Sequence, residues 1–206
     1  TLRKKAEDRL RLMKTSIDSA YDEVFWMDMA GNFLYVNDAA CRVTGYSCEE
    51  LTAMTVFDLD PDFSRARWEA SVADLKKNKK QFFQTRHRRK DGVILDVEIG
   101  SVFVSRGKEE FSFCFVRDVT ERKRIEAALK ESEARYRSLA EASQDMIFVV
   151  DRDDRVLYVN QRAADFHHVS PDDMIGKQRG EFFPPDVSAG QLRGLQEVFS
   201  SGKPVR

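Results

Sequence analysis

The feature that most constrains the fold of this chain is an internal repeat. Residues 28–40 recur as residues 151–163, and the two copies align without a gap at a constant offset of 123 positions. The pairs that define this offset include Asp28 and Asp151, Tyr35 and Tyr158, Asn37 and Asn160, and Ser47 and Ser170. Because the spacing is far longer than the period of stacked repeats, each copy is expected to be a whole domain with its own core.

The bulk composition agrees with two modest domains. The 206 residues are 42% hydrophobic and carry a formal net charge of −1, so no global attraction to nucleic acid or to an anionic membrane is expected. The longest purely apolar run, residues 146–150, is too short to cross a bilayer, and the N-terminus shows no signal-peptide pattern. We therefore expect a cytoplasmic segment without direct membrane contact, and any membrane anchor of the parent protein is expected outside this sequence.

The three cysteines show no recognisable arrangement. Cys41, Cys48 and Cys114 have neither a paired spacing nor the Cys-x-x-Cys pattern of metal sites. This usage suits a reducing compartment, and no metal site is predicted.

The first copy is predicted to follow an amphipathic helix, assigned to residues 1–16. Apolar residues recur there at three- and four-residue steps, the pattern of a helix with one buried face. They are Leu2, Ala6, Leu10, Met13 and Ile17. Residues 24–28 and 33–37 then read as two short strands joined by a tight turn.

Helix caps are visible in the sequence after the second strand. Asn37 is placed to cap a short helix that Gly45 ends. Ser47 with Glu50 forms a capping box for the next helix. A longer amphipathic helix is predicted after Pro61, and it carries Phe63, Trp68, Val72 and Leu75.

Three strands are predicted to complete the first copy, at residues 81–88, 93–104 and 110–119. The last of them is apolar on both faces, with Phe111, Phe113 and Phe115 on one side and Cys114 and Val116 on the other. A strand of this kind needs cover on both sides. We expect the N-terminal helix, from the same chain or from a partner, to supply the outer cover.

A continuous helix is predicted between the two copies, because residues 120–143 contain neither Gly nor Pro. Its apolar and small residues step by four and three, which is the heptad pattern of a helix–helix seam. The seam is formed by Ile125, Leu129, Ser132, Tyr136 and Leu139. It extends over about two and a half heptads and predicts a homodimer through this helix.

Several ordered motifs of the first copy resemble those of the PAS family. They are Asp28 to Gly31 with Tyr35, Val36 and Asn37; Thr44 to Ser47 leading into Glu49, Glu50 and Leu51; Arg88 to Gly92; and Asp118, Val119 and Thr120 followed by Glu121, Arg122 and Lys123. The last string is similar to the D-x-T motif found where a PAS sheet passes into its output helix. The resemblance implies an α+β PAS fold with a five-stranded antiparallel sheet and flanking short helices, in two copies joined by a long helix.

The corresponding domain boundaries are an N-terminal helix at 1–16, a first PAS domain at 17–120, a linker helix at 121–136 and a second PAS domain at 137–206. The sequence ends before the counterparts of the three later strands of the second copy. We therefore expect the second copy to be incomplete and the chain to be a piece of a longer protein, with an output domain downstream.

The expected ligand pocket of the first domain is lined by Trp68, Phe83, Leu95, Val97 and Phe113, although plain core packing explains the same residues. The resemblance does not favour haem, because the longer helix holds no histidine. It does not favour flavin either, because Cys48 lies in a Ser-Cys-Glu-Glu-Leu string rather than in the flavin-binding motif. A small organic ligand remains open, and the cofactor is unknown.

No catalytic residue is predicted in this chain. The histidines, His87, His167 and His168, have no converging partners, and no phosphate-binding glycine loop is present. The basic run at residues 76–90 is the one nucleic-acid-like feature, and we interpret it as a charged sheet edge rather than as a binding patch.

The resemblance implies that this chain is the sensory segment of a signalling protein. The signalling protein that it favours is a sensor histidine kinase of a two-component system. Asp118 and Thr120 are the expected relay residues, with Thr120 as N-cap of the linker helix. Two alternatives remain open. One is a passive protein–protein interaction and dimerisation module, and the other is the input segment of a cyclic-dinucleotide synthase.

Overall fold

The computed structural model describes residues 2–204 and divides the chain into two compact units. The first unit is Thr1–Glu126 and the second is Ala127–Arg206. The two units correspond to the two copies of the repeat. No helix within residues 2–204 is both long enough and apolar enough to cross a membrane.

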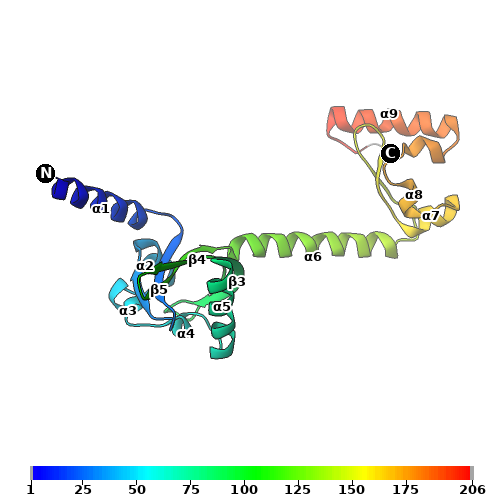
Figure 1. Cartoon of the computed structure of the whole chain (residues 1–206). Coiled ribbons are helices and arrows are strands. Elements are labelled where there is room, and N and C mark those ends of the chain that lie inside the picture. Colours follow the sequence, from blue (N-terminus) through cyan, green and yellow to red (C-terminus); the bar gives the residue numbers. More distant parts are fainter. Residues whose placement is uncertain (1, 205–206) are drawn as a thin grey trace. The chain divides into compact units, whose positions relative to one another are not determined.

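The first unit contains an antiparallel sheet of five strands within its described residues (Figure 1). The strands are β1 (Glu23–Asp28), β2 (Phe33–Val36), β3 (Lys80–Arg88), β4 (Ile94–Arg106) and β5 (Glu109–Asp118). Their order across the sheet is β2-β1-β5-β4-β3, so β5 lies in the centre and pairs with both β1 and β4. The predicted α+β fold with a five-stranded antiparallel sheet is confirmed.

Short helices connect β2 to β3, and their caps follow the sequence signals. They are α2 (Asp38–Thr44), α3 (Cys48–Thr52), α4 (Val56–Leu59) and α5 (Arg65–Asn78). The Asn37 side chain accepts a hydrogen bond from the backbone N of Ala40, and Gly45 ends α2 with a left-handed φ of 78°. Ser47 and Glu50 form the expected capping box of α3. Phe63 lies before α5 rather than in it, because Ser64 caps that helix.

One face of the sheet and these helices enclose the core of the first unit. Alternation along the strands places Phe25 and Met27 of β1, Val97 and Ile99 of β4, and Cys114 and Val116 of β5 in this core. Leu51, Leu59 and Trp68 close it from the helical side.

The outer face of the sheet is covered less than we predicted. The N-terminal helix α1 (Leu2–Asp18) contributes Met13, Lys14 and Ile17 to a groove that Trp26, Leu34 and Phe113 also line. Phe115 nevertheless stays 49% exposed and Phe82 70% exposed, so α1 covers only one end of this face within the described residues. The side chains of Leu2, Ala6 and Leu10, which the sequence placed on the apolar face of α1, lie outside the described part.

Two of the three cysteines are paired, although their spacing in the sequence did not predict a disulfide. Cys41 and Cys48 form a disulfide whose Cα atoms are 5.6 Å apart, while Cys114 is free and buried. The pair was missed because a separation of seven residues carries no signal by itself. It is the reversal of the chain at Gly45, between α2 and α3, that brings the two cysteines together.

A single helix, α6 (Thr120–Ala142), begins in the first unit and ends in the second (Figure 1). It is longer at both ends than the predicted linker helix at 121–136. Four of the five seam residues are strongly exposed: Ile125, Leu129, Tyr136 and Leu139 range from 58% to 71%. Nothing within the described residues therefore covers this stripe.

The second unit repeats the start of the first. Its elements are β6 (Phe148–Val150), β7 (Val156–Val159), α7 (Gln161–His167), α8 (Pro171–Met174), a 3-10 helix η1 (Arg179–Phe182) and α9 (Pro185–Ser201). The strands β6 and β7 pair in antiparallel fashion. A small core forms from Val156, Val159, Ala163, Ala164 and Met174. The described residues of this unit thus contain two strands where the first unit contains five.

Candidate functional site

The core of the first unit contains a small cavity between the inner face of the sheet and helices α4 and α5. Its volume is about 30 Å³, measured as the space open to the centre of a water-sized sphere. Its walls are mostly apolar and include Phe25, Phe33, Leu59, Phe63 and Trp68. A volume of this size holds one or two water molecules, whereas pockets for drug-sized ligands measure roughly 300–1,000 Å³. A haem- or flavin-sized group does not fit without displacing side chains.

Polar groups line one side of this cavity. The Cys114 sulfur lies 3.1 Å from the Ser101 hydroxyl and 3.3 Å from the Ser112 hydroxyl. The Gln81 amide donates to the Ser71 hydroxyl at 2.9 Å. These groups are already paired with one another, and burial raises the pKa of the Cys114 thiol. The cavity therefore offers hydroxyl, amide and thiol groups on an otherwise apolar wall.

His87 is a cavity residue that the sequence analysis did not identify. It is 3% exposed, and its Nδ1 atom has no hydrogen-bond partner. Burial lowers the pKa of the imidazole to about 4, so the ring is neutral at physiological pH. The alternation along β3 places Thr85 and His87 on the inner face, and this period-two pattern was the available signal.

The five predicted pocket residues separate into three groups. Trp68 and Phe83 line the cavity, and the Trp68 indole nitrogen donates to the Met29 carbonyl at 3.1 Å. Leu95 and Val97 are buried in the core but are not among the lining residues. Phe113 does not line the cavity, because in β5 it is Ser112, Cys114 and Val116 that face inward. Phe113 instead contacts Trp26 and Phe115 on the outer face.

The start of α6 is attached to the sheet of the first unit by side-chain contacts. The Asp118 carboxylate accepts a hydrogen bond from the backbone N of Thr120 at 2.8 Å and so connects the end of β5 to the first residue of α6. The Lys123 ammonium contacts the Asp96 carboxylate at 2.9 Å. Arg122 and Glu98 form an ion pair at 2.6 Å. Helix and strand β4 are thus joined by several contacts within one helical turn.

Thr120 does not have the N-cap role that we predicted. It is the first residue of α6, and its hydroxyl oxygen accepts a hydrogen bond from the backbone N of Asp96 at 2.9 Å. The hydroxyl therefore connects the helix to β4 instead of capping it. Val119 donates its backbone N to the Asp96 carbonyl, and this contact places the next residue, Thr120, beside the Asp96 backbone.

The end of α6 is held by the second unit through two side chains. The Tyr158 hydroxyl donates to the Glu141 carboxylate at 2.6 Å. The Asn160 amide donates to the carbonyls of Ala140 and Asp145, both at 2.9 Å. The Asn160 side-chain oxygen also accepts from the backbone N of Ile147. We call this group, with Tyr158 and Asn160 as its donors, the helix clamp of the second unit.

The first unit holds the end of α1 by the same contacts. Tyr35 donates its hydroxyl to Asp18, and the Asn37 amide donates to the Ile17 carbonyl at 3.0 Å. Asn37 also donates to the Asp22 carbonyl and accepts from Val24. Every partner pair in the two clamps differs by the offset of 123. The repeated Tyr and Asn are visible in the sequence, but their contacts with the preceding helix were not predicted, and Asn37 was expected only to cap α2.

Glu23 is a second functional candidate that the sequence did not reveal. It is 2% exposed, and neither carboxyl oxygen has a hydrogen-bond partner. Burial, followed by the nearby carboxylates of Asp118 and Asp22, raises the pKa of Glu23 to about 8. The second copy carries Met146 at the equivalent position. The buried carboxyl is therefore a property of the first unit alone, next to the strand end from which α6 begins.

Two models of known families match the chain. A model described as a PAS domain matches residues 22–121, and one described as a PAS fold matches residues 140–206. The matched regions correspond to the first and second copies of the repeat.

Similar curated proteins are signalling proteins that are much longer than this chain. Sporulation kinase E of Bacillus subtilis is 26% identical over 156 residues, which cover 75% of this chain and 21% of that protein. A methyl sulfide methyltransferase-associated sensor of Methanosarcina acetivorans is 25% identical over 142 residues, 68% of this chain and 14% of that protein. The chain thus spans about a fifth or less of these relatives.

Solved structures agree with the fold of the first unit. A PAS domain from a two-component sensor histidine kinase is 34% identical, with a TM-score of 0.50, and the match covers 55% of this chain and 98% of that one. The PAS domain of an HTR-like protein from Haloarcula marismortui has a TM-score of 0.53 at 19% identity, covering 56% of this chain and 96% of that one.

Proposed function

Because this chain belongs to the PAS family, which it matches in both of its copies, we propose that it is a tandem sensory module. In this proposal the first unit detects a small molecule or a protein partner. Helix α6 then relays the resulting state to the second unit and on to an output domain. The chain itself carries no catalytic step.

The observation that carries the proposal is the attachment of α6 at both ends. At its start, Asp118 and Thr120 connect the helix to β5 and β4. At its end, Glu141 and the Ala140 carbonyl are held by the second unit. A helix without an interruption over 23 residues transmits a rotation or a shift from one end to the other.

The energetic demand on such a relay is modest. A ligand that prefers one state of the first unit by a hundredfold supplies about 2.7 kcal/mol. A neutral hydrogen bond is worth about 0.5–1.5 kcal/mol and a partly exposed ion pair about 1 kcal/mol or less, so one contact of each kind is together no larger than this. Exchange or loss of the contacts of Asp96 with Thr120 and Lys123 is therefore within reach of ligand binding.

The cavity limits the kind of input. With about 30 Å³, it accepts a ligand of very few heavy atoms, unless the side chains of α4 and α5 move apart. Its hydroxyl, thiol and amide groups favour a small polar molecule over a purely apolar one.

A histidine kinase is the output that we propose, in a protein where this chain is an upstream part. The similarity to sporulation kinase E and to a PAS domain of a sensor histidine kinase supports this output. A cyclic-dinucleotide synthase remains the alternative. The exposed seam of α6 further supports a homodimer, in which Ile125, Leu129, Tyr136 and Leu139 pack against a second copy.

Hydrogen exchange in the 206-residue chain distinguishes a relay from a passive docking module. The substitution Cys114→Leu overpacks the cavity on β5, the strand that ends at Asp118. The backbone amide of Ile147 donates to the Asn160 side chain, and that of Gln161 donates to the Glu141 side chain. If α6 relays this change, the exchange rates of these two amides should change about fivefold or more. Altered exchange within β5 verifies that the substitution acts on the first unit.

The matched control is the same substitution with two alanines inserted after Arg124. The insertion keeps Arg122 and Lys123 in place but rotates the rest of the helix by about 200°. The response of the second unit should then be lost. A docking module predicts no response in either protein, and unchanged exchange at Ile147 and Gln161 while β5 responds would refute the relay.

A further inference from the structure

We propose that Cys41 and Cys48 form a reversible dithiol–disulfide pair, which makes the corner between α2 and α3 a redox-modification site. This second input holds whether or not the cavity of the first unit binds a ligand. The oxidant that it would take is a small, uncharged peroxide such as hydrogen peroxide.

The geometry allows both redox states in one fold. The Cα atoms of the two cysteines are 5.6 Å apart, the separation typical of native disulfides. Other contacts hold the same corner: the Gly45 backbone N donates to the Cys41 carbonyl, and Ser47 forms its capping box. Leu51 anchors α3 in the core with no exposed surface. The thiols therefore meet without a backbone rearrangement, and the corner does not depend on the disulfide for its shape.

Small reagents can reach the pair. Cys41 and Cys48 are both partly buried rather than enclosed, whereas Cys114 is only 4% exposed. Cys48 lines an open groove together with Lys14 of α1 and Leu34 of β2. Attack from solvent is thus available at Cys48 and closed at Cys114.

The charges of the groove select the kind of oxidant. Lys14 is its one basic lining residue, and three acidic residues, Asp18, Asp38 and Glu49, line it as well. An acidic surface repels anionic reagents such as glutathione disulfide. A neutral peroxide is not repelled.

The chemistry balances with hydrogen peroxide as the oxidant. The Cys48 sulfur attacks one peroxide oxygen, the O–O bond breaks, and one water leaves with a sulfenic acid formed on Cys48. The Cys41 sulfur then attacks the Cys48 sulfur, the S–O bond breaks, and a second water leaves. Two thiols are oxidised to one disulfide while the peroxide is reduced to two waters, and a dithiol reductant reverses the change by exchange.

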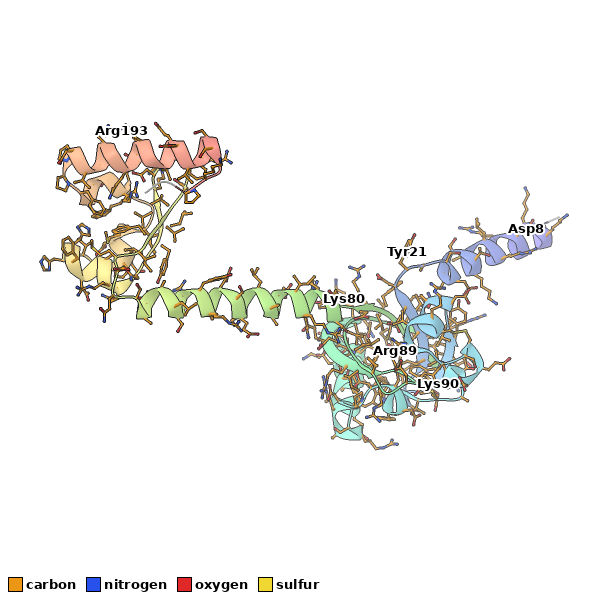
Figure 2. All side chains as sticks on the ribbon, turned by 180° about the vertical axis from the view of Figure 1, so that it is seen from behind. Asp8, Tyr21, Lys80, Arg89, Lys90 and Arg193 are labelled. Carbon is orange, nitrogen blue, oxygen red and sulfur yellow. A yellow bond between two sulfur atoms is a disulfide. The ribbon has the colours of Figure 1, made fainter. Side chains whose placement is uncertain are left out.

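The modification acts at a junction of the first unit. The Lys90 backbone N donates to the Thr44 carbonyl at 2.9 Å, and the Lys90 ammonium contacts the Glu50 carboxylate at 2.6 Å. Lys90, which lies just after β3, is labelled in Figure 2. The groove beside Cys48 also contains Tyr35 and Asp18, which hold the end of α1. Oxidation therefore restrains residues 41–48, whose Thr44 binds Lys90 and which lie beside the residues that hold the end of α1.

The second copy supplies an internal comparison. Ala164 and Pro171 stand at the positions of Cys41 and Cys48. The same corner of the second unit therefore cannot form the bond, and any redox response there must come from another source.

The test uses the 206-residue chain, reduced with dithiothreitol, freed of reductant and exposed to hydrogen peroxide. Iodoacetamide and mass spectrometry then count the free thiols. We expect the loss of two alkylation sites, restored by dithiothreitol, and a disulfide-linked peptide that contains Cys41 and Cys48. Cys114→Ala should behave in the same way, and Cys41→Ser/Cys48→Ser should form no intramolecular disulfide. The acidic groove should also slow the oxidation of the two thiols by anionic glutathione disulfide relative to a neutral disulfide of similar reactivity. The opposite order of rates would overturn the proposed selection against anionic oxidants.

Hydrogen exchange separates a switch from an inert crosslink. In the oxidised chain the amides of Gly45 and Lys90 should exchange about tenfold more slowly than in the reduced chain. The bond closes the short loop 41–48, which contains Gly45 and the Thr44 carbonyl that accepts from the Lys90 amide. The amide of His168, at the position of Gly45 in the second copy, provides the control. Equal exchange at Gly45 and Lys90 in the two redox states, or a pair that peroxide does not join, would overturn the proposal.

Discussion

Replacing Glu23 by glutamine should remove a loss of stability that the first unit undergoes as the pH rises. The carboxyl group is 2% exposed and has no hydrogen-bond partner, so its ionised form is strongly disfavoured in the folded chain. Glutamine keeps the size and polarity of the side chain but cannot ionise.

The magnitude follows from the raised pKa. Below pH 4.5 the side chain is protonated in both the folded and the unfolded chain, and it makes no difference to stability. Between pH 4.5 and about 8 the unfolded chain releases the proton and the folded chain keeps it. The free energy of unfolding therefore falls by about 1.4 kcal/mol per pH unit over this range, which amounts to about 3 kcal/mol at pH 7.

Tryptophan fluorescence isolates the relevant unit, because the two tryptophans of the chain, Trp26 and Trp68, both lie in the first unit. Urea unfolding at pH 5 and pH 7 should show Glu23→Gln gaining about 2 to 3 kcal/mol on the wild-type chain between these two values. Glu23→Met, which introduces the residue of the second copy, should follow Glu23→Gln. Glu109→Gln controls for the loss of one carboxylate from the exposed end of β5. Parallel pH profiles of the wild-type chain and Glu23→Gln would refute the reasoning.

Three further predictions concern the clamp, the buried histidine and the seam. Asn37→Ala should destabilise the first unit by about 2 to 4 kcal/mol in urea unfolding followed by tryptophan fluorescence, since it loses a cap and leaves buried backbone groups unpaired; Asn160→Ala, the same change in the second copy, should leave that signal in place. NMR of the His87 imidazole should show a neutral ring down to about pH 5, and stability should fall as the pH drops from 6.5 towards 4, because the folded chain binds fewer protons there; a His87 titration near pH 6.5 would contradict its burial. Ile125→Asp with Leu129→Asp should convert a dimer into a monomer in sedimentation equilibrium, whereas Glu126→Gln on the same helix should not; a wild-type chain that sediments as a monomer would count against the seam.

Local signals in the sequence were sufficient for the elements and their caps. The boundaries of α2 and α3 follow from Asn37, Gly45 and the Ser47–Glu50 pair, whose hydrogen bonds join residues three or four positions apart. Such short-range hydrogen bonds can be predicted from the spacing of the residues alone. The repeat shows the same pattern a second time, and for this reason the antiparallel sheet and the two-copy organisation were predictable.

The errors concern contacts between residues that only the folded chain brings together. Alternation shows that Phe113 and Cys114 face opposite sides of β5, but the inner side is decided by the neighbouring strands β1 and β4. The helices pack on the side of Cys114, and Phe113 is left outside. The Cys41–Cys48 pair was hidden for the same reason, since the turn at Gly45 had to be formed before the two sulfurs met.

The candidate site was predictable in part. Trp68 and Phe83 line the cavity as their apolar spacing indicated, and Asp118 binds the start of the helix. Glu23 and His87 were missed because charged and titratable residues are normally exposed, and composition gives no warning when the fold encloses them. The repeat contains one signal for Glu23, because the equivalent position of the second copy holds the apolar residue Met146.

The two clamps determine where this chain can be cut and recombined. Because each domain grips the last turn of the helix that precedes it, the smallest exchangeable cassette is a helix end together with the domain that follows. A chimera spliced immediately before β6 would leave Tyr158 and Asn160 without Glu141 and Ala140, whereas a splice in the middle of α6, near the division between Glu126 and Ala127, keeps both sets of partners intact. Duplication of such a cassette would produce an array in which every domain binds the end of the helix that precedes it.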